Sequence, residues 1–429
     1  MKFRGTSEVD FAQDFFSQDF FSQNFSFSIF AQNVCAGIKK GNDRIFSEKK
    51  RNLDSRYVLI TDMSCQQKFP DSEACCDKGG SIKALLMRKP GDVVLADYPT
   101  PVPDKNQVLV RIHAAGICVN DIRDYKGECD FTYPRIGGHE YAGEIVQLGE
   151  NVNTKRYHIG QKVVTYCIDN CGECYFCHHG LENICPDFKQ SIAYRNPDGV
   201  SGFFGFAQYI AADTRDLFIC GDEVPYEKLA LTEPMACVLN SINRTKLCFG
   251  DDVLVIGGGT MGLLHVMLAK LQGVRVILSE PDEKRRKKAL SLGADLALDP
   301  FACDIVREVM EITGGVGANA VFNTTAVPAL ALQAIDAAAQ NGTVIMFSSL
   351  HPNEPVPVNL GSVHSTQKTI TGAQNGSIEA FRQAVALLNK GLFDPSALIE
   401  AIYDYRDFDK AMACAMQADT YKVVLQIGN

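Results

Sequence analysis

The 429-residue sequence predicts an α/β protein with a doubly wound parallel sheet, joined to a smaller β-rich domain. Two observations predict this fold class. After Glu233, short apolar strands alternate with helical patterns at the spacing of βαβ units. Between Ile82 and about Ile210, short strand-like runs are separated by glycine and proline turns instead. Residues 1–81 follow neither pattern.

The expected elements can be placed from apolar periodicity and turn residues. The β-rich segment begins with the expected strands Ile82–Met87, Val93–Ala96 and Gln107–His113. The alternating segment is expected to contain strands at Asp252–Ile256, Val274–Ser279, Ala320–Asn323 and Thr343–Ser348, and helices at Met261–Gln272, Glu283–Leu292 and Ala329–Ala339. The last part is expected to hold one long helix, Ile378–Lys390, and a closing strand, Tyr421–Ile427.

The N-terminal 81 residues differ in composition from the rest. Phenylalanines recur about every five residues between polar ones, which suits neither a helix nor a strand. We therefore expect residues 1–81 to be a disordered, low-complexity extension, or an upstream translation of a chain that starts near Met63. The alternative is an aromatic segment for self-association or for binding a partner. Acidic residues and the lack of a continuous apolar run argue against a signal or transit peptide.

The composition excludes several classes of partner. The formal net charge of −9 disfavours nucleic acid and anionic membranes, which both attract basic surfaces. The sequence has no apolar run of about 18 residues or more, so we expect no membrane span and a cytoplasmic location. Sixteen cysteines in such a chain indicate metal sites and thiols rather than disulfides.

A glycine-rich turn predicts a dinucleotide site. Gly257, Gly259 and Gly262 form G-x-G-x-x-G directly after an expected strand and at the start of a helix. The glycines permit a tight turn, and the helix N-terminus can face the pyrophosphate. Glu280 ends the next strand, where a carboxylate accepts hydrogen bonds from ribose hydroxyls and disfavours a 2′-phosphate. We therefore expect NAD rather than NADP. Arg285 is a candidate cofactor contact, and together with Arg286 it could instead bind the 2′-phosphate of NADP, or both could simply lie on a solvated helix face.

Four cysteines predict a structural metal site. They follow the spacing C-x2-C-x2-C-x7-C, which allows four thiolates to surround one tetrahedral ion. A complete set of four sulfur ligands leaves no open position, so zinc here would be structural; iron–sulfur ligation is the alternative. The four residues are Cys171, Cys174, Cys177 and Cys185.

Two further motifs suggest a catalytic metal. Residues 116–121 read G-I-C-V-N-D, and residues 138–152 carry G-H-E-x2-G-x5-G-x2-V. Together with the cysteine lobe and the glycine turn, in this order, the sequence from Ile82 to Asn429 resembles the zinc-containing medium-chain alcohol dehydrogenase family. The run T-E-P-M-A-C at 232–237 is similar to the sorbitol (polyol) and threonine dehydrogenase branch.

The resemblance implies an architecture and a set of site residues. It implies a GroES-like catalytic domain at 82–235, a Rossmann NAD-binding domain at 236–372, and a return to the catalytic domain at 373–429, after the extension at 1–81. It further implies that Cys118 and His139 bind a catalytic zinc, that Glu140 is a third ligand or a nearby carboxylate, and that Glu233 is a further ligand or the partner of a bound water. Two zinc ions per chain and a homo-oligomer, dimer or tetramer, are also implied.

Two positions depart from the pattern of many relatives. Asn120 stands where they have a serine or threonine that passes on the proton, and an amide cannot do so. Arg123 stands where many have a histidine; it could bind an anionic substrate group or pair with Asp121 or Asp124. Tyr125 could contact substrate or belong to the core.

The function expected from these features is the reversible oxidation of a secondary alcohol, a polyol or sugar derivative, by NAD with zinc. A threonine or hydroxy-acid dehydrogenase is the main alternative, and a primary-alcohol or aldehyde reductase is another. A zinc-stabilised nucleotide-binding protein without turnover is the alternative from a different class.

Overall fold

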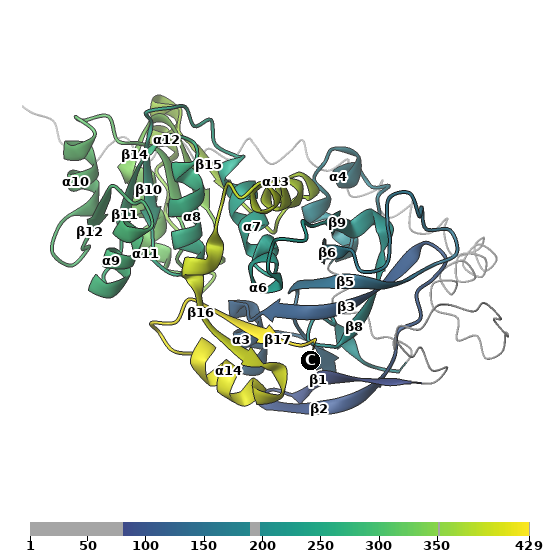
Figure 1. Cartoon of the computed structure of the whole chain (residues 1–429). Coiled ribbons are helices and arrows are strands. Elements are labelled where there is room, and N and C mark those ends of the chain that lie inside the picture. The colour runs from purple at the N-terminus through teal and green to yellow at the C-terminus, as the bar shows by residue number, and fades with distance from the viewer. Residues whose placement is uncertain (1–79, 189–197, 351, 429) are drawn as a thin grey trace, which may run out of the picture. The chain divides into compact units, whose positions relative to one another are not determined.

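The computed structural model describes residues 80–188, 198–350 and 352–428 (Figure 1). These residues belong to one compact unit, Cys76–Asn429. The predictions made for residues 1–79 fall outside the described residues and stay predictions.

In the described part of the chain, one sheet is parallel throughout. Its strands are, in spatial order, β12 (Leu296–Leu298), β11 (Arg275–Ser279), β10 (Asp252–Ile256), β13 (Ala318–Asn323), β14 (Ala338–Met346) and β15 (Thr369–Gly372). The chain runs outward from β10 to one edge and then from β13 to the other. This is the order of a Rossmann sheet, whose switch point between β10 and β13 is the usual place for a ligand.

Helices on this sheet connect its strands: α8 (Thr260–Lys270), α9 (Glu283–Ser291), α10 (Ile305–Ile312), α11 (Pro328–Ala337) and α12 (Leu360–Thr366). The central strands are buried on both faces, which explains why they read as apolar runs and not as alternating patterns. The predicted strand at Asp252–Ile256 is confirmed without change.

The predicted boundary between helix α11 and strand β14 is wrong. The helix expected to reach Ala339 ends at Ala337, and β14 begins at Ala338, earlier than the expected Thr343. Ala338 pairs with Ala318 of β13 in the ladder, so strand pairing overrides the helix propensity of the alanines. The short elements β12, α10, α12 and β15 were not predicted.

The β-rich domain contains two sheets within the described residues. One holds β16 (Ile399–Asp404), β17 (Lys422–Gln426), β3 (Gln107–Gly116), β5 (Glu140–Leu148), β6 (Lys162–Thr165) and β9 (Leu217–Ile219), with β8 (Tyr209–Asp213) paired to β3. The other holds β2 (Asp92–Pro99), β1 (Ser81–Lys89), β4 (Arg135–Ile136) and β7 (Ser201–Gly202). The strands expected near residues 82, 93 and 107 are therefore β1, β2 and β3.

The C-terminal segment returns to the β-rich domain. Strand β17 pairs antiparallel with β3, so the yellow end of the chain lies beside one of its first strands (Figure 1). Helix α14 (Phe408–Ala415), which was not predicted, packs against β16 and β17. The closing strand therefore forms part of the same sheet as β3 and β5, which carry the expected zinc motifs.

The remaining helical elements lie in loops and at the junction of the two domains. They are α3 (Val119–Tyr125), α4 (Tyr175–His178), η1 (Glu182–Ile184), η2 (Thr214–Asp216), α6 (Tyr226–Leu229), α7 (Thr232–Ile242), α13 (Ile378–Asn389), η3 (Pro395–Leu398) and η4 (Tyr405–Asp407). Helix α13 packs against α7, and one core cluster extends from both helices to the apolar strands of the parallel sheet. The hydroxyl of Tyr166 donates to the carbonyl of Gly376 over 3.0 Å, which adds a polar tie.

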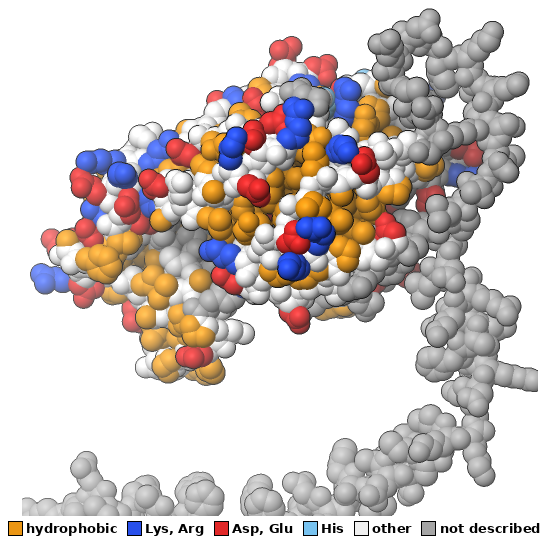
Figure 2. Space-filling view, turned by 90° about the horizontal axis from the view of Figure 1, so that it is seen from below, with side chains coloured by type: hydrophobic (Ala, Val, Ile, Leu, Met, Phe, Trp, Pro, Cys, Tyr) orange, Lys and Arg blue, Asp and Glu red, His pale blue; other side chains and the backbone are white. Residues whose placement is uncertain are grey.

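The described residues contain no helix that is long and apolar enough to cross a membrane. On the face shown in Figure 2, acidic and basic side chains are interspersed around hydrophobic ones. This face therefore presents charges of both signs.

Candidate active site

The glycine turn joins β10 to α8 at the switch point of the parallel sheet. Gly257 has φ of +99°, a conformation that favours glycine. A side chain at position 262 would overlap the carbonyl of Gly257. Helix α8 can therefore approach strand β10 this closely only because residue 262 is a glycine. Gly259 is the N-cap of α8 and leaves the first backbone N–H groups of the helix available to an anion.

Glu280 lies beside this turn, at the end of β11, and is almost fully buried. One carboxylate oxygen accepts from the backbone N–H of Gly258 over 2.6 Å, and the other from Asp282 over 2.9 Å. A carboxylate can accept about four hydrogen bonds, so each oxygen can still take a ribose hydroxyl. The carboxylate is therefore fixed at the place where a nucleotide ribose is expected.

The two arginines that follow have different surroundings. The Arg285 guanidinium lies 4.0 Å from Glu280 and also donates to the carbonyl of Ala418. Arg286 donates to the carbonyls of Glu280 and Pro281 and pairs with Asp299. Arg285 therefore borders the glycine turn, whereas Arg286 is held by the protein.

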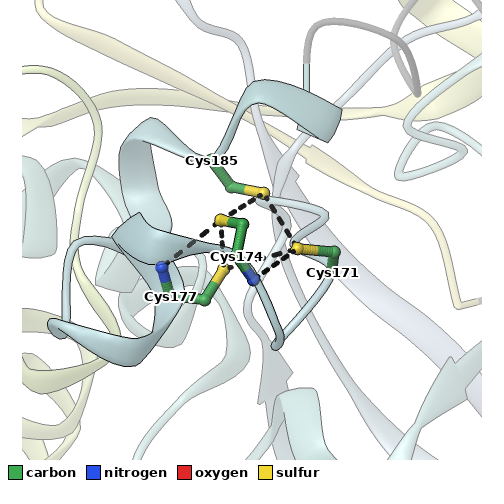
Figure 3. Close-up of side chains that lie close together, drawn as sticks. All are labelled: Cys171, Cys174, Cys177 and Cys185. Carbon is green, nitrogen blue, oxygen red and sulfur yellow. Dashed lines mark hydrogen bonds between the residues drawn. The ribbon is translucent and has the colours of Figure 1, made fainter.

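The four cysteines of the lobe converge (Figure 3). Neighbouring sulfur atoms lie from 3.5 Å apart, between Cys174 and Cys177, to 3.9 Å apart, between Cys174 and Cys185. A disulfide needs about 2.05 Å, whereas four ligands tetrahedral around zinc at about 2.3 Å lie about 3.8 Å apart. The geometry thus fits a single ion held by four thiolates, and none of the described cysteines is in a disulfide.

The second group of potential metal ligands lies where strand β3 ends and strand β5 begins. Cys118 follows β3 as the N-cap of α3, and His139 and Glu140 stand at the start of β5. One ligand atom from each of these three residues lies within 4.8 Å of the others. The sequence motifs at 116–121 and 138–143 are thus brought together in space.

Asp121 holds these two segments in register. It is buried, and its two oxygens accept from the backbone N–H of Cys118 over 2.9 Å and of Gly138 over 3.3 Å. Sequence reasoning quoted this aspartate as part of a motif but gave it no role. Its signal was its place three residues after Cys118, the spacing at which a side chain can bond back to the N-cap backbone.

Glu233 lies in the first turn of α7, outside the three-residue group. It accepts a hydrogen bond from the Cys237 thiol one turn later, over 3.1 Å. Its charge reaches the same cluster, because Glu233 is among the groups that raise the pKa of His139.

The electrostatics of the cluster suit a bound cation. Burial raises the pKa of Cys118 and of Glu233, since both would be anions without enough water. Burial alone would lower the pKa of His139, but Cys118, Asp121 and Glu233 together raise it well above its usual value. A buried set of thiolate, imidazole and carboxylate ligands with excess negative charge is the environment in which a zinc ion is stabilised.

The chain matches known proteins along both of its expected domains. Residues 104–222 match the family model described as alcohol dehydrogenase GroES-like domain, and residues 260–390 match zinc-binding dehydrogenase. A sorbitol dehydrogenase from Halalkalibacterium halodurans is 31% identical over 351 residues, which cover 80% of this chain and 99% of that protein. The chain belongs to the zinc-binding alcohol dehydrogenase family. Its members are NAD(P)-linked oxidoreductases that act on CH–OH groups, which confirms the expected fold, reaction class and cofactors.

Two further members of the family are informative. An L-threonine 3-dehydrogenase from Pyrococcus horikoshii is 30% identical, with 80% of this chain and 98% of that protein covered. A zinc-binding dehydrogenase from Sinorhizobium meliloti 1021, solved bound to NADP, superposes with a TM-score of 0.74 at 26% identity, covering 81% of this chain and all of that one.

The positions that depart from the family pattern have defined surroundings. Asn120 is exposed in the first turn of α3. Arg123 lies 3.9 Å from Glu128, so the alternative in which it pairs with Asp121 or Asp124 does not hold in the described part of the chain. Both aspartates are buried and engaged elsewhere, Asp124 with Arg135 over 3.0 Å.

Three further residues lie in or near the site: Tyr125, Lys422 and Cys237. Tyr125 packs against the core cluster, with its ring edge-on to Phe408. Sequence reasoning missed Lys422, whose ammonium lies against Glu140, and Cys237. The only signal for Lys422 was a lysine at the start of a mostly apolar closing strand.

Proposed function

We propose that this family member oxidises a secondary alcohol of a polyol or sugar derivative with NAD, at a zinc site built from Cys118, His139 and a carboxylate. The convergence of Cys118, His139 and Glu140 is the single observation that carries the proposal. It is supported by the preformed nucleotide turn and by similarity to a sorbitol dehydrogenase.

The proposed ligand set leaves room for a substrate. Cys118 and His139 supply the sulfur and the imidazole, and Glu140 or Glu233 supplies an oxygen. A zinc ion held there acts as a Lewis acid and lowers the pKa of the substrate hydroxyl. The separate ligands Cys171, Cys174, Cys177 and Cys185 are proposed for a structural zinc, which gives two zinc ions per chain.

The reaction divides the substrate's two hydrogens between different acceptors. NAD bound at the Gly257 turn would supply the acceptor for the C–H hydrogen as hydride, and the O–H hydrogen would leave as a proton, so the products would be a ketone, NADH and a proton. Asn120 cannot take that proton because an amide is not a base at neutral pH. We assign the proton acceptor to Glu233, whose bond from the Cys237 thiol occupies only one of its oxygens.

The cofactor preference is proposed from Glu280. Its buried carboxylate would accept ribose hydroxyls and repel a 2′-phosphate, which favours NAD. Arg285 beside Gly259 is proposed to line the same site, and the NADP-bound relative makes the preference worth measuring.

A threonine-type substrate is the second candidate, because a threonine dehydrogenase is similar over nearly its whole length. It would need a cation for the substrate carboxylate. Arg123 is the residue expected for that role, and its ion pair with Glu128 is long and partly exposed.

The decisive experiment uses the whole chain and follows NADH formation across polyols, threonine, hydroxy acids and sugar phosphates, with zinc counted in the same preparation. Turnover of polyols with about two zinc ions per chain supports the proposal. Turnover of threonine alone would replace the substrate class. Bound NAD without turnover of any alcohol would favour a nucleotide-binding protein instead.

We also propose the domain boundaries 82–235, 236–372 and 373–429.

We further propose that the chain forms a homo-oligomer. Strand β15 lies at the edge of the parallel sheet and Ile370 in it is partly exposed, so this edge can pair with another copy of the chain.

A further inference from the structure

Helix α3, which begins directly after the proposed zinc ligand Cys118, has one buried side and one open side. Asp121 and Asp124 are buried on the side that faces the core. On the other side, Val119 is 62% exposed, and Lys126 at the end of the helix is exposed as well. The open side of α3 therefore leads away from the proposed zinc ligands along the surface.

Two basic residues, Arg123 and Lys126, lie on this open side. Arg123 stands four residues after Val119 and three before Lys126, and residues at these spacings share one side of a helix. The backbone N–H of Lys126 still donates to the carbonyl of Ile122 over 3.0 Å, so the helical spacing extends to this residue. The two side chains are therefore neighbours and bring two positive charges to one place.

The fold makes little use of either charge within the described residues. The guanidinium of Arg123 lies 3.9 Å from the carboxylate of Glu128, and the two side chains are 29% and 53% exposed. An exposed pair at this distance has no hydrogen bond and contributes little to stability. Asp121 and Asp124 are bonded elsewhere, and Lys126 forms no ion pair with a described residue. Both cations are therefore available to a ligand.

The place of the two cations along α3 determines which part of a substrate they can bind. Arg123 lies five residues after Cys118, which is a rise of about 7.5 Å at about 1.5 Å per residue. Lys126 lies about 4.5 Å further along the helix. An anion held by both side chains therefore belongs to the far end of a substrate whose hydroxyl group is bound beside Cys118.

The charge of the pair favours a phosphate over a carboxylate. A phosphate monoester carries about 1.5 to 2 negative charges at pH 7, whereas a carboxylate carries one. Arginine can form two parallel hydrogen bonds to phosphate oxygens, and lysine adds a compact positive charge. Arg123 and Lys126 together match the charge of the phosphate.

We propose that Arg123 and Lys126 bind the phosphate of a phosphorylated polyol, whose hydroxyl group at the other end of the molecule is oxidised at the Cys118 site. This inference rests on the proposed function, because the metal site must hold that hydroxyl group. It narrows the substrate class to polyols that carry a terminal phosphate. Glu128 competes with the phosphate for Arg123.

The test uses the whole chain with zinc and NAD and compares sorbitol with its terminal phosphate ester. The wild type should have the higher kcat/KM for the ester. Arg123→Gln should lower kcat/KM for the ester about tenfold or more, because a hydrogen bond to a charged group is lost, and leave that for sorbitol unchanged. Lys126→Gln should have a smaller effect in the same direction. Lys155→Gln, which removes an exposed positive charge in another loop, is the control.

Glu128→Gln gives a change of opposite sign. It removes the carboxylate that competes for Arg123, so kcat/KM for the ester should rise while that for sorbitol stays the same. Titration calorimetry with the ester is a readout that needs no turnover. The ester should bind more weakly to R123Q and more tightly to E128Q than to the wild type.

The outcomes separate failure of this inference from failure of the proposed function. If NAD binds but neither compound is oxidised, the proposed function is wrong and this inference with it. If sorbitol is oxidised and R123Q affects both compounds equally or neither, only the phosphate site is wrong. Turnover of threonine that R123Q abolishes would assign Arg123 to a carboxylate and would also overturn the phosphate site.

Discussion

At the scale of single residues, burial determines what each polar side chain can do. Solvent hardly reaches the side chains of Asp121, Glu140 and Lys422. Asp121 accepts a hydrogen bond from the backbone of Cys118, and Lys422 donates one to Glu140. His265 has a purely structural environment: its Nδ1–H donates to the carbonyl of Met261, and its Nε2 accepts from Ser241. Histidine is therefore a structural residue at position 265, whereas at position 139 it is a proposed metal ligand.

The two proposed zinc sites can be separated by matched cysteine substitutions. Cys118→Ser should lower kcat/KM on the order of 10³-fold, because zinc's stabilisation of the developing alkoxide charge contributes several kcal/mol. Cys174→Ser should instead lower the thermal midpoint, with the active-site ligands still in place. Zinc analysis should find about one ion fewer in each variant. Full activity in the Cys118 variant would contradict the assignment.

His265 should make stability fall in mild acid. Burial lowers its pKa to about 4, against about 6.5 in the unfolded chain. Between these values the unfolded chain takes up a proton that the folded protein does not, so stability falls as the pH drops from 6.5 to 4. The loss between pH 7 and pH 5 should be about 2 kcal/mol. Urea unfolding of the wild type and of His265→Gln measures it, and equal pH dependence in both would refute the prediction.

At the scale of elements, β10, the glycine turn and α8 form the proposed nucleotide site, and Glu280 follows β11 beside this turn. Every part is local in the sequence. The turn needs glycines for steric reasons, and the helix N-terminus needs no particular side chain to attract phosphate. This explains why the nucleotide site could be predicted from the spacing of the glycines and of Glu280 in the sequence.

Glu280→Ala should weaken the binding of NAD and reduce the enzyme's preference for NAD over NADP. Loss of hydrogen bonds to a charged acceptor costs about 1.5–3 kcal/mol, or about 10- to 150-fold in kcat/KM for NAD. The ratio of the two cofactors' kcat/KM values should shift toward NADP. Lys284→Gln, exposed on the neighbouring helix, is the control and should leave the ratio unchanged. An unaltered ratio in the Glu280 variant would contradict the ribose contact.

At the scale of the whole molecule, the closing strand β17 brings the end of the chain to the proposed active site. Strand β17 completes the sheet of β3 and β5, and its first residue reaches Glu140, 282 positions earlier. In the other domain, β15 is an edge strand of the parallel sheet.

If copies of the chain pair through this edge, Ile370→Lys should shift the mass in solution toward the monomer, because a charge on an edge strand disfavours pairing. Light scattering behind size-exclusion chromatography measures the mass. Val102→Lys, which also places a charge at an exposed apolar position, should leave it unchanged. An unchanged mass for both variants would place any interface elsewhere.

Most of the fold class was predictable, and the errors have a common cause. The apolar strands at 252–256 and 275–279 were found because strands buried on both faces need continuous apolar runs. The short elements β12, β15 and α14 were missed because they are held by neighbours rather than by their own periodicity. The start of β14 was misread because Ala338 has helix propensity and strand pairing outweighs it.

The sequence by itself determined the features whose physical requirement acts over a few residues: the glycine turn and the cysteine spacing of the lobe. It also predicted Cys118 and His139 as zinc ligands, because each stands in a short motif, and the structure brings the two side chains together. Only the tertiary structure decided the partners of the carboxylates, with Lys422 against Glu140 and the Cys237 thiol on Glu233. Strand register and helix packing set such contacts, and residues that meet across a sheet need no fixed separation along the chain.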